Sequence, residues 1–291
     1  MSEINKAPLL VVAGVRNETS FGWSAAEAWL ERDPNNEVLV TARGEKSVEF
    51  VRSQVEETNG RIDLVAPLDW TEESAADALY KHLTSTIGSD RRLGGLVHAV
   101  AWAPPENFTT SAHELPTEVY RQAMDATSFS LLNLVHGARE NLADSAGIVT
   151  FGFGEHDRVY TEYGPALSTA KDSLSHLINQ LGVSLGQETP SARTAEIATW
   201  FVPTYAGRGV LAGIGKQRGE RVRPEQVKEY AAEKLAALKS ADPDQQRINA
   251  GRIAVSFIAD EMWSQTTGFH IPVDAGVPLR GHNIFPETNN E

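Results

Sequence analysis

The stretch PLLVVAGVRNETSFGW, from Pro8 to Trp23, joins an uninterrupted apolar run to a turn that contains glycine. Apolar runs that do not alternate with polar residues are typical of strands covered on both faces, as in a parallel sheet. The same kind of run recurs along the chain, at Pro8–Gly14, Glu37–Ala42, Arg61–Leu68, Gly94–Val100, Gly147–Gly152, Ala195–Phe201 and Gly268–Asp274. We therefore predict seven strands in one parallel sheet.

Helical patterns lie between these runs. Apolar residues at three- and four-residue spacing occupy Ser24–Glu31, Glu73–Ile87, Leu115–Leu142 and Pro165–Gly186. Because alternating strands and helices form right-handed crossovers, we predict an α/β fold, a Rossmann-type doubly wound sheet in a single domain over residues 1–281. Residues 203–241 interrupt the alternation with a glycine-rich stretch and an amphipathic helix. This insert is a candidate substrate lid, and residues 282–291 are expected to form a C-terminal tail.

Composition narrows the possible partners. The chain has 291 residues, a net charge of −13 and no cysteine. The negative charge argues against nucleic acid, and the lack of cysteine excludes disulfides, thiolate metal sites and cysteine nucleophiles. We find no run of about eighteen apolar residues and no secretion signal, so we expect a cytoplasmic protein that does not cross the membrane. A basic cluster between Arg208 and Lys228 is either a solvated face or a landing patch for an anionic substrate or carrier.

The first turn predicts where a nucleotide would bind. In an open α/β sheet, ligands lie beyond the carboxyl ends of the strands, with phosphate at the start of the first crossover helix. Here Gly14 and Gly22 are far apart, so the compact GxGxxG pattern is missing. The hydroxyls of Thr19 and Ser20 could cap the helix and bond a pyrophosphate, although a simple capped turn would have the same sequence.

A group of motifs in a fixed order extends this pattern over most of the chain. After the first strand come glycine, five residues, serine and an apolar residue; then follow LVHAVAWAPP (Leu96–Pro105), TAK (Thr169–Lys171) and GFHIPVDAG (Gly268–Gly276). In these motifs the chain resembles the enoyl-acyl-carrier-protein reductases, a divergent branch of the short-chain dehydrogenase/reductases. The segment IGSDRRLGGLVHA is most similar to the long-chain, mycolic-acid type.

The resemblance implies an activity and its partners. Members reduce the 2,3 double bond of enoyl thioesters with NADH or NADPH in fatty-acid elongation. It implies a substrate carried on acyl carrier protein or coenzyme A, a homotetramer and no metal.

It also implies roles for single residues. The implied cofactor-binding residues are Gly14, Ser20 and Phe21 at the pyrophosphate turn, Asp69 at the adenine, Ala99, Val100 and Ala101 beside the nicotinamide ribose, Lys171 on the ribose hydroxyls, and Thr204 near the nicotinamide end or diphosphate. Phe153 stands where the family has an aromatic substrate contact, but a core phenylalanine would look the same. Asp69 could instead cap the turn that follows it. We interpret His98, on a buried strand, as a satisfied core residue.

The end of the second strand bears on the choice of cofactor. A carboxylate there bonds the ribose 2′-hydroxyl of NAD, whereas an arginine accepts the 2′-phosphate of NADP. The chain reads TARGEK from Thr41, with no acid at the first three places and with Arg43 available. This favours NADPH slightly, and NADH stays open because the long-chain branch uses it without such an acid.

The tyrosine that should donate to the thioester oxygen is out of register. In the family, six residues separate it from the lysine, whereas seven separate Tyr163 from Lys171. If Gly164 caps the helix and Pro165 begins it, Tyr163 lies outside the helix and its hydroxyl could still reach the site. Tyr163 would then be both the catalytic group beside Lys171 and a substrate contact. Otherwise the tyrosine has been lost, or Tyr160 replaces it.

Two other functions remain open. A carbonyl reductase of the same superfamily would need Tyr-x-x-x-Lys, and Leu167 occupies its tyrosine place. A catalytically silent homologue would bind nucleotide as a sensor or a structural partner. Bulky residues from Trp200 to Pro203, where the family has a Gly-Pro turn, agree with such a departure.

Overall fold

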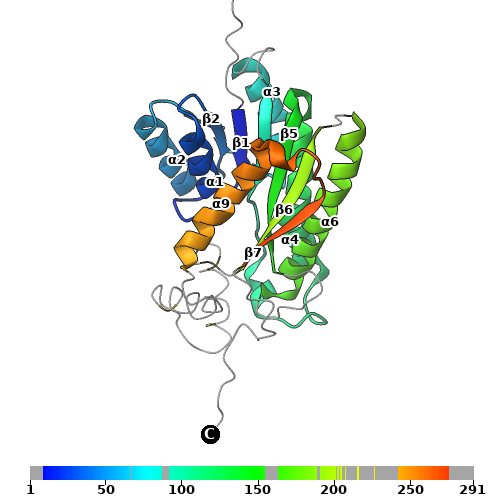
Figure 1. Ribbon diagram of the computed structural model, residues 1–291. Helices are drawn as coiled ribbons and strands as arrows, with labels where there is room; N and C mark the ends of the chain where they lie inside the picture. Colours follow the sequence, from blue (N-terminus) through cyan, green and yellow to red (C-terminus); the bar gives the residue numbers. More distant parts are fainter. Residues whose placement is uncertain are drawn as a thin grey trace, which may run out of the picture.

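The fold is described from a computed structural model, which covers residues 9–65, 67–86, 92–154, 163–188, 191–200, 202, 204, 207, 215, 226 and 242–274. Seven parallel strands form one sheet in the order β3-β2-β1-β4-β5-β6-β7 (Figure 1). Their bounds are β1 Leu9–Ala13, β2 Glu37–Thr41, β3 Ile62–Val65, β4 Leu93–His98, β5 Leu142–Phe153, β6 Arg193–Thr199 and β7 Phe269–Val273. The predicted Rossmann-type sheet is confirmed, with a β5 that begins earlier than expected.

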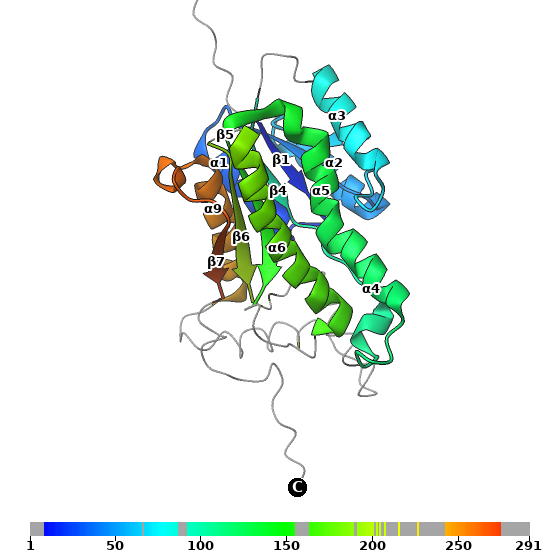
Figure 2. The ribbon, with the colours of Figure 1, turned by 90° about the vertical axis from the view of Figure 1, so that its right-hand side faces the viewer.

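Helices cover both faces of this sheet (Figure 2). One face carries α1 (Phe21–Arg32), α2 (Glu45–Glu57) and α9 (Pro243–Ala259); the other carries α3 (Ser74–Thr86), α5 (Ser130–Ala138) and α6 (Pro165–Glu188). Alternate residues of β1 face opposite layers, with Leu10 and Val12 in one core and Leu9 and Val11 in the other. All four are at most 3% exposed, which explains the uninterrupted apolar run.

The expectation that every strand is covered on both faces is wrong for β7. Phe269, its first residue, is 44% exposed, and none of the strand's residues is fully buried. β7 is the last strand in the sheet order, so β6 is its only neighbour within the sheet. An apolar run at a sheet edge therefore does not require a helix on each side.

The segment Leu115–Leu142, for which helical spacing was predicted, contains several elements. It consists of α4 (Thr117–Met124), a π-helical turn over Asp125–Phe129, α5 and a short 3₁₀ turn before β5 begins at Leu142. Two buried hydroxyls in the π turn point inward. The Thr127 hydroxyl accepts a hydrogen bond from Trp102 N (3.2 Å), and the Ser128 hydroxyl donates to Ala170 O (2.5 Å). Single π-helical turns of this kind occur within longer helices, frequently near functional sites.

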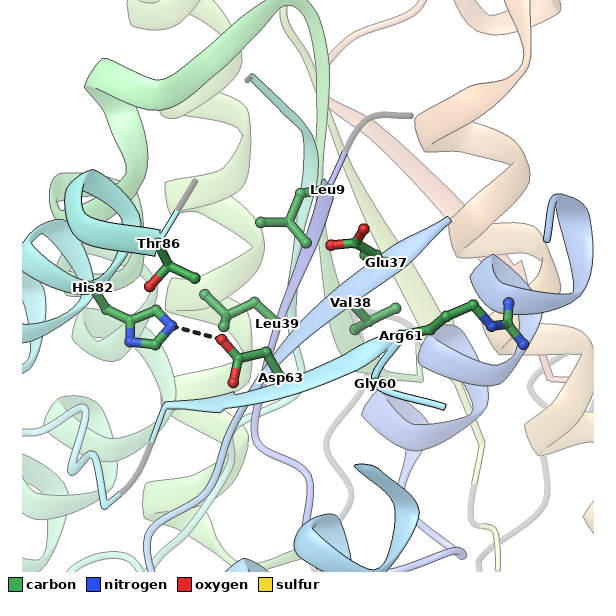
Figure 3. Close-up of a pocket in the computed structure, with 9 residues that line it drawn as sticks. All are labelled: Leu9, Glu37, Val38, Leu39, Gly60, Arg61, Asp63, His82 and Thr86. Carbon is green, nitrogen blue, oxygen red and sulfur yellow. Dashed lines mark hydrogen bonds and ion pairs between the residues drawn. The ribbon is translucent and has the colours of Figure 1, made fainter. Parts of the chain in front are cut away.

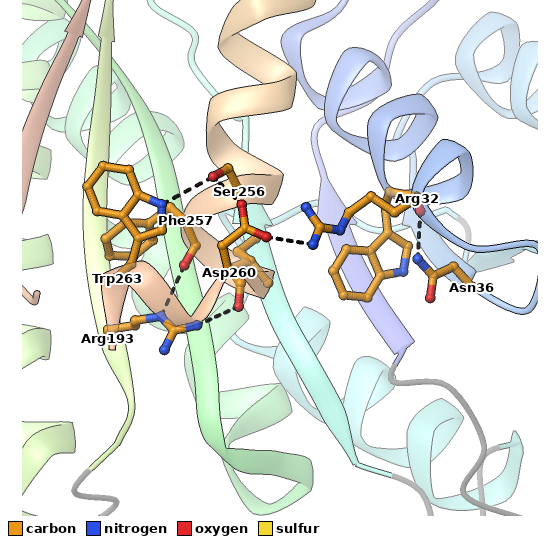
Figure 4. Close-up of polar contacts among 9 residues, drawn as sticks. Arg32, Asn36, Arg193, Ser256, Phe257, Asp260 and Trp263 are labelled. Carbon is orange, nitrogen blue, oxygen red and sulfur yellow. Dashed lines mark hydrogen bonds and ion pairs between the residues drawn. The ribbon is translucent and has the colours of Figure 1, made fainter. Parts of the chain in front are cut away.

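A polar network fastens α9 at the amino ends of the strands (Figure 4). Arg193 of β6 donates to the carbonyls of Phe257 and Ile258, at 3.0 and 2.8 Å, which lie in the last turn of α9. Asp260, just after α9, pairs with Arg32 of α1 at 2.5 Å. These contacts tie α9 to β6 and α1 at the end of the sheet opposite to the carboxyl ends of the strands.

Several predictions fall outside the described residues. The lid insert over residues 203–241 is described only at single positions, and its basic cluster and the tail are not described. Within the part of the chain that is described, no helix has both the length and the apolar character to cross a membrane.

Candidate functional site

The first turn packs closely against the segment after β4. Gly14 has a φ of 95°, and a Cβ there would lie 2.5 Å from Ala99 O and 2.9 Å from Val100 N. Ala99 N also donates to Ala13 O at 2.8 Å. Only glycine allows both this φ and this close approach. The structure therefore brings together three of the residues expected to bind a cofactor.

The expected capping of α1 by hydroxyls is wrong. Ser20 takes the N-cap position, but its hydroxyl accepts hydrogen bonds from Arg16 N (3.0 Å) and Asn17 N (3.1 Å) and bonds no amide of α1. The Thr19 hydroxyl donates to Asn17 Oδ1 at 2.9 Å. The cause is Asn17, whose short amide organises the turn and draws the hydroxyls backward. The first amides of α1 therefore have no side-chain cap from Ser20, which suits an anion.

Two residues expected at the adenosine end form an ion pair. Arg43 Nη1 lies 3.1 Å from Asp69 Oδ2, and the Arg43 side chain is 57% exposed. Asp69 Oδ1 accepts hydrogen bonds from the backbone and hydroxyl of Thr71, so Asp69 does cap the turn, as the alternative interpretation held. Burial raises the pKa of Asp69, but the Thr71 hydrogen bonds and the charge of Arg43 outweigh it and lower the pKa overall. Asp69 is thus a carboxylate at neutral pH.

Lys171 lies in the interior, under the carboxyl end of β5. Lys171 is a residue of α6 and is 6% exposed, and its Nζ donates a hydrogen bond to Phe151 O at 2.5 Å. Burial lowers its pKa to about 8, against the opposing effect of the negative charge of Glu196. The ring of Phe21, from the start of α1, stacks on Phe151 with centroids 5.0 Å apart. The start of α1 and the lysine therefore meet at the same strand.

The sequence motifs did not identify Glu196, a buried carboxylate beside Lys171. Glu196 of β6 is 1% exposed, accepts a hydrogen bond from the Ser175 hydroxyl and lies 3.1 Å from His270 Nδ1 on β7. A Cβ on the neighbouring Gly152 would overlap its Oε1, so the two positions fit each other. The signal was an acidic residue within the otherwise apolar run AEIATWF.

His98 is a satisfied core residue, as predicted. It is fully buried, with Nδ1 3.0 Å from the Thr150 hydroxyl and Nε2 2.8 Å from the Ser130 hydroxyl. Burial, together with the charge of Lys171, lowers its pKa to about 3. His98 is therefore a neutral imidazole near pH 7.

Tyr163 lies outside α6, in agreement with the first interpretation of the extra residue. The helix begins at Pro165, and Gly164 before it has a φ of 80°. The Tyr163 ring stacks on Phe153, with centroids 4.0 Å apart and 4° between the planes, and Phe153 stacks on Trp200 at 5.4 Å. Burial of the phenol raises the pKa of Tyr163 above that of an ordinary tyrosine.

Through this stack Tyr163 lies beside β5, the strand whose Phe151 carbonyl accepts the hydrogen bond from Lys171. Phe153 ends β5, only two residues after the carbonyl that accepts from Lys171 Nζ. Asn107, which the sequence analysis did not single out, bonds the Tyr163 backbone from the loop after β4. Among the remaining expected residues, Thr204 is buried and accepts from Gly207 N at 3.0 Å, whereas Tyr160 lies outside the described residues.

A small pocket at the opposite edge of the sheet is a separate feature (Figure 3). It lies at the starts of β1, β2 and β3, with Leu9, Glu37 and Arg61 among its lining residues. His82 Nε2 lies 3.0 Å from Asp63 Oδ2 on one side of it. None of the residues expected to bind cofactor or substrate lines this pocket.

Known proteins share both the sequence pattern and the fold. A family model described as enoyl-(acyl carrier protein) reductase matches residues 14–278. The enoyl-[acyl-carrier-protein] reductase [NADH] of Enterococcus faecalis is 25% identical over 272 residues, which cover 93% of this chain and 97% of that protein. The [NADPH] enzyme of Staphylococcus aureus strain MRSA252 is 21% identical over 266 residues, or 91% and 94% of the two chains.

A solved structure extends the comparison to three dimensions. The enoyl-acyl carrier protein reductase of Bacillus cereus, solved with NADP⁺ and indole naphthyridinone, superposes with a TM-score of 0.77 at 22% identity. The match covers 94% of this chain and 98% of that one. At this identity the comparison establishes the shared fold.

Proposed function

The chain belongs to the enoyl-(acyl carrier protein) reductase family, and from this premise we propose that it reduces the 2,3 double bond of enoyl thioesters with NADH or NADPH. One observation carries the proposal at the level of residues: the phenol of Tyr163 and the ammonium of Lys171 both lie at the carboxyl end of β5. In an open α/β sheet that is the edge where ligands bind. The pathway we propose is fatty-acid elongation.

The described residues fit a dinucleotide. Gly14 lets the backbone of the first turn approach Ala99 and Val100, and the start of α1 has no side-chain cap from Ser20. The exposed Arg43 guanidinium suits a 2′-phosphate. Because a guanidinium carries several donors, Arg43 can bond a phosphate while it keeps its ion pair with Asp69. When bound, the reduced nicotinamide supplies a hydride. NADH and NADPH both appear in the names of the relatives.

Lys171 and Tyr163 have distinct roles in this proposal. The Lys171 ammonium is fixed by Phe151 O and holds the ribose hydroxyls. The Tyr163 hydroxyl donates to the thioester oxygen as negative charge develops there, which stabilises the enolate electrostatically. Its raised pKa keeps the phenol protonated, so it remains a donor over the neutral range. The ring of Phe153 stacks on the Tyr163 ring and is itself stacked on Trp200, so the aromatic row supports the phenol.

The finer features belong to the same proposal. We expect the acyl group to be carried on acyl carrier protein, as the relatives' names indicate for those proteins, or on coenzyme A. We also expect the protein to be a homotetramer and to be located in the cytoplasm. We expect a single domain in which residues 203–241 form a substrate lid.

Turnover of reduced cofactor tests the proposal directly. Purified protein should consume NADH or NADPH when given crotonyl or longer enoyl thioesters on either carrier. Tyr163→Phe should lower kcat by about 10²- to 10⁴-fold, the usual contribution of a positioned proton donor, and leave cofactor binding intact. Tyr160→Phe is the matched control and should keep its turnover.

Other outcomes would identify the rival functions. Full activity in Tyr163→Phe would exclude this residue as the donor. Tight nucleotide binding with no consumption on any enoyl thioester would indicate a catalytically silent homologue. Consumption on ketones and aldehydes alone would indicate a carbonyl reductase.

A further inference from the structure

Asn107 joins the loop after β4 to the turn that carries Tyr163. It lies in the 3₁₀ turn η1 (Pro105–Phe108), and it is 1% exposed. Its side-chain amide donates to Tyr163 O at 3.0 Å, while Oδ1 accepts from Ala166 N at 2.8 Å and Leu167 N at 3.0 Å. One buried side chain thus bonds both the tyrosine backbone and the first amides of α6.

The partners define which way the amide points. Two backbone N–H groups require an acceptor, so the oxygen must face α6. The Tyr163 carbonyl requires a donor, so the nitrogen must face the tyrosine. Asn107 therefore performs two separable tasks. Its Oδ1 caps α6, and its Nδ2 holds the backbone of Tyr163.

Gly164 shows how tightly this turn is closed. Its φ of 80° reverses the chain between Tyr163 and the helix. A Cβ at this position would lie 2.2 Å from Asn107 Nδ2 and 2.3 Å from Asn107 O. Asn107 therefore packs directly on the glycine, and the backbone on both sides of Gly164 is fixed by the same residue.

We propose that Asn107 is a positioning residue for Tyr163, which compensates for the extra residue between Tyr163 and Lys171. A tyrosine within the helix would have its direction set by helical phase. Tyr163 lies outside α6, so its direction depends on contacts from elsewhere, and the Asn107 amide supplies a hydrogen bond to its backbone. The inference rests on the proposed function, since it assigns Tyr163 a task that needs positioning.

Asn107→Asp separates the two tasks. The carboxylate still accepts from Ala166 and Leu167, and a negative charge at a helix N-terminus is favourable. It has no proton for the Tyr163 carbonyl, so two oxygens would face each other there. We expect kcat to fall at least tenfold with KM for the cofactor close to that of the wild type, and Tm to fall because the Tyr163 carbonyl loses its donor. Asn107→Ser, which is uncharged and too short to reach Tyr163, should lower kcat similarly.

The control removes the same kind of bond elsewhere. The Asn36 side-chain amide donates to Trp29 O at 2.7 Å and is also buried (Figure 4). Asn36 directly precedes β2, at the amino ends of the strands. Asn36→Asp should lower Tm and leave kcat unchanged. A helix cap without a positioning role predicts the opposite result for Asn107→Asp, namely full kcat.

A spectroscopic readout keeps this inference separate from the proposed function. In protein labelled with 3-fluorotyrosine, the ¹⁹F resonance of Tyr163 is identified by its loss in Tyr163→Phe. It should shift in Asn107→Asp and Asn107→Ser and stay in place in Asn36→Asp, whether or not the protein turns over enoyl thioesters. An unmoved Tyr163 resonance, or wild-type kcat, in both Asn107 variants would overturn the inference.

Discussion

The ring of Tyr163 lies flat against the ring of Phe153, with 4.0 Å between their centroids and 4° between their planes. Phe153 is the last residue of β5, and Tyr163 precedes α6. The contact joins the strand that supplies the carbonyl for Lys171 to the turn that supplies the phenol. The relation between tyrosine and lysine therefore depends on tertiary packing across a strand end, where the family pattern would rely on helical spacing.

Removing this stack should cost both stability and turnover. We expect Phe153→Leu to lower the free energy of unfolding by about 0.5–1.5 kcal/mol beyond the loss of buried area, the usual worth of an aromatic pair. Because the phenol loses its flat support, kcat should fall as well. Urea unfolding and steady-state kinetics measure the two effects.

The control for this change is Phe129→Leu. Phe129 is 43% exposed and is the last residue of the π turn between α4 and α5. It should leave kcat and the unfolding midpoint almost unchanged. If Phe153→Leu and Phe129→Leu behaved alike, the stack would have no part in holding Tyr163.

Two glycines near the ends of α6 should respond to alanine in opposite directions. Gly164→Ala forces an alanine into a φ of 80°, costing roughly 1–2 kcal/mol, and brings its Cβ into Asn107. Gly186→Ala adds a Cβ with nothing within 4 Å inside the helix, so it should stabilise the protein by about 0.5–1 kcal/mol. Urea unfolding of both variants checks the signs. A neutral Gly164→Ala would show that the turn can relax.

These contrasts show which features could be predicted from the sequence. The central strands are buried on both faces, so their apolar runs are uninterrupted and easily recognised, as β1 illustrates. The start of α6 was also predictable, because Gly164 and Pro165 have strong preferences at the cap and the first position. Local chemistry decides both features, so nearby residues are sufficient.

The site depended on contacts that local sequence does not contain. Asn107 bonds residues 56 to 60 positions away, and Glu196 meets His270 74 positions further along. The direction of the Ser20 hydroxyl was predicted wrongly because Asn17 competes for the same groups. A pattern gives residue types at a spacing, and only the fold determines which of several available partners each group takes.

Arg43 should distinguish the two cofactors. Its guanidinium is mostly exposed and lies beside Asp69, where the adenosine end of a nucleotide is expected. Arg43→Ala should weaken NADPH binding by about tenfold to a hundredfold, the worth of a charge-assisted hydrogen bond of roughly 1.5–3 kcal/mol, and change NADH binding little. Fluorescence titration of both reduced cofactors measures the difference.

Arg52→Ala provides the comparison for Arg43→Ala. Arg52 is exposed on α2. Its replacement by alanine removes one positive charge from the surface, as Arg43→Ala does, at a residue that is not expected to bind the cofactor. It should affect neither cofactor. Equal weakening of NADH and NADPH in Arg43→Ala would show that Arg43 does not read the 2′-phosphate.

The buried ammonium predicts an alkaline limit to activity. Burial lowers the pKa of Lys171 to about 8, and the proposed role needs its protonated form. We therefore expect kcat/KM to be constant below about pH 8 and to fall above it. His98 and Tyr163 do not titrate in that range, because the pKa of His98 is about 3 and that of Tyr163 is raised above its ordinary value of 10.0.

Glu196→Gln tests the origin of this limit. The negative charge of Glu196 raises the pKa of Lys171, so its removal should move the alkaline fall of kcat/KM to lower pH. Glu188→Gln, an exposed change at the end of α6, should leave the fall in place.

The pH dependence of stability separates loss of the Lys171 proton from unfolding as the cause of the alkaline fall. Since the pKa of Lys171 is lower in the folded state than the ordinary 10.5, the unfolded chain binds more protons between about pH 8 and 10.5, and this group's contribution to stability rises with pH there. Activity that falls while this contribution rises would assign the limit to the Lys171 ammonium, and an alkaline limb unmoved in Glu196→Gln would contradict the assignment.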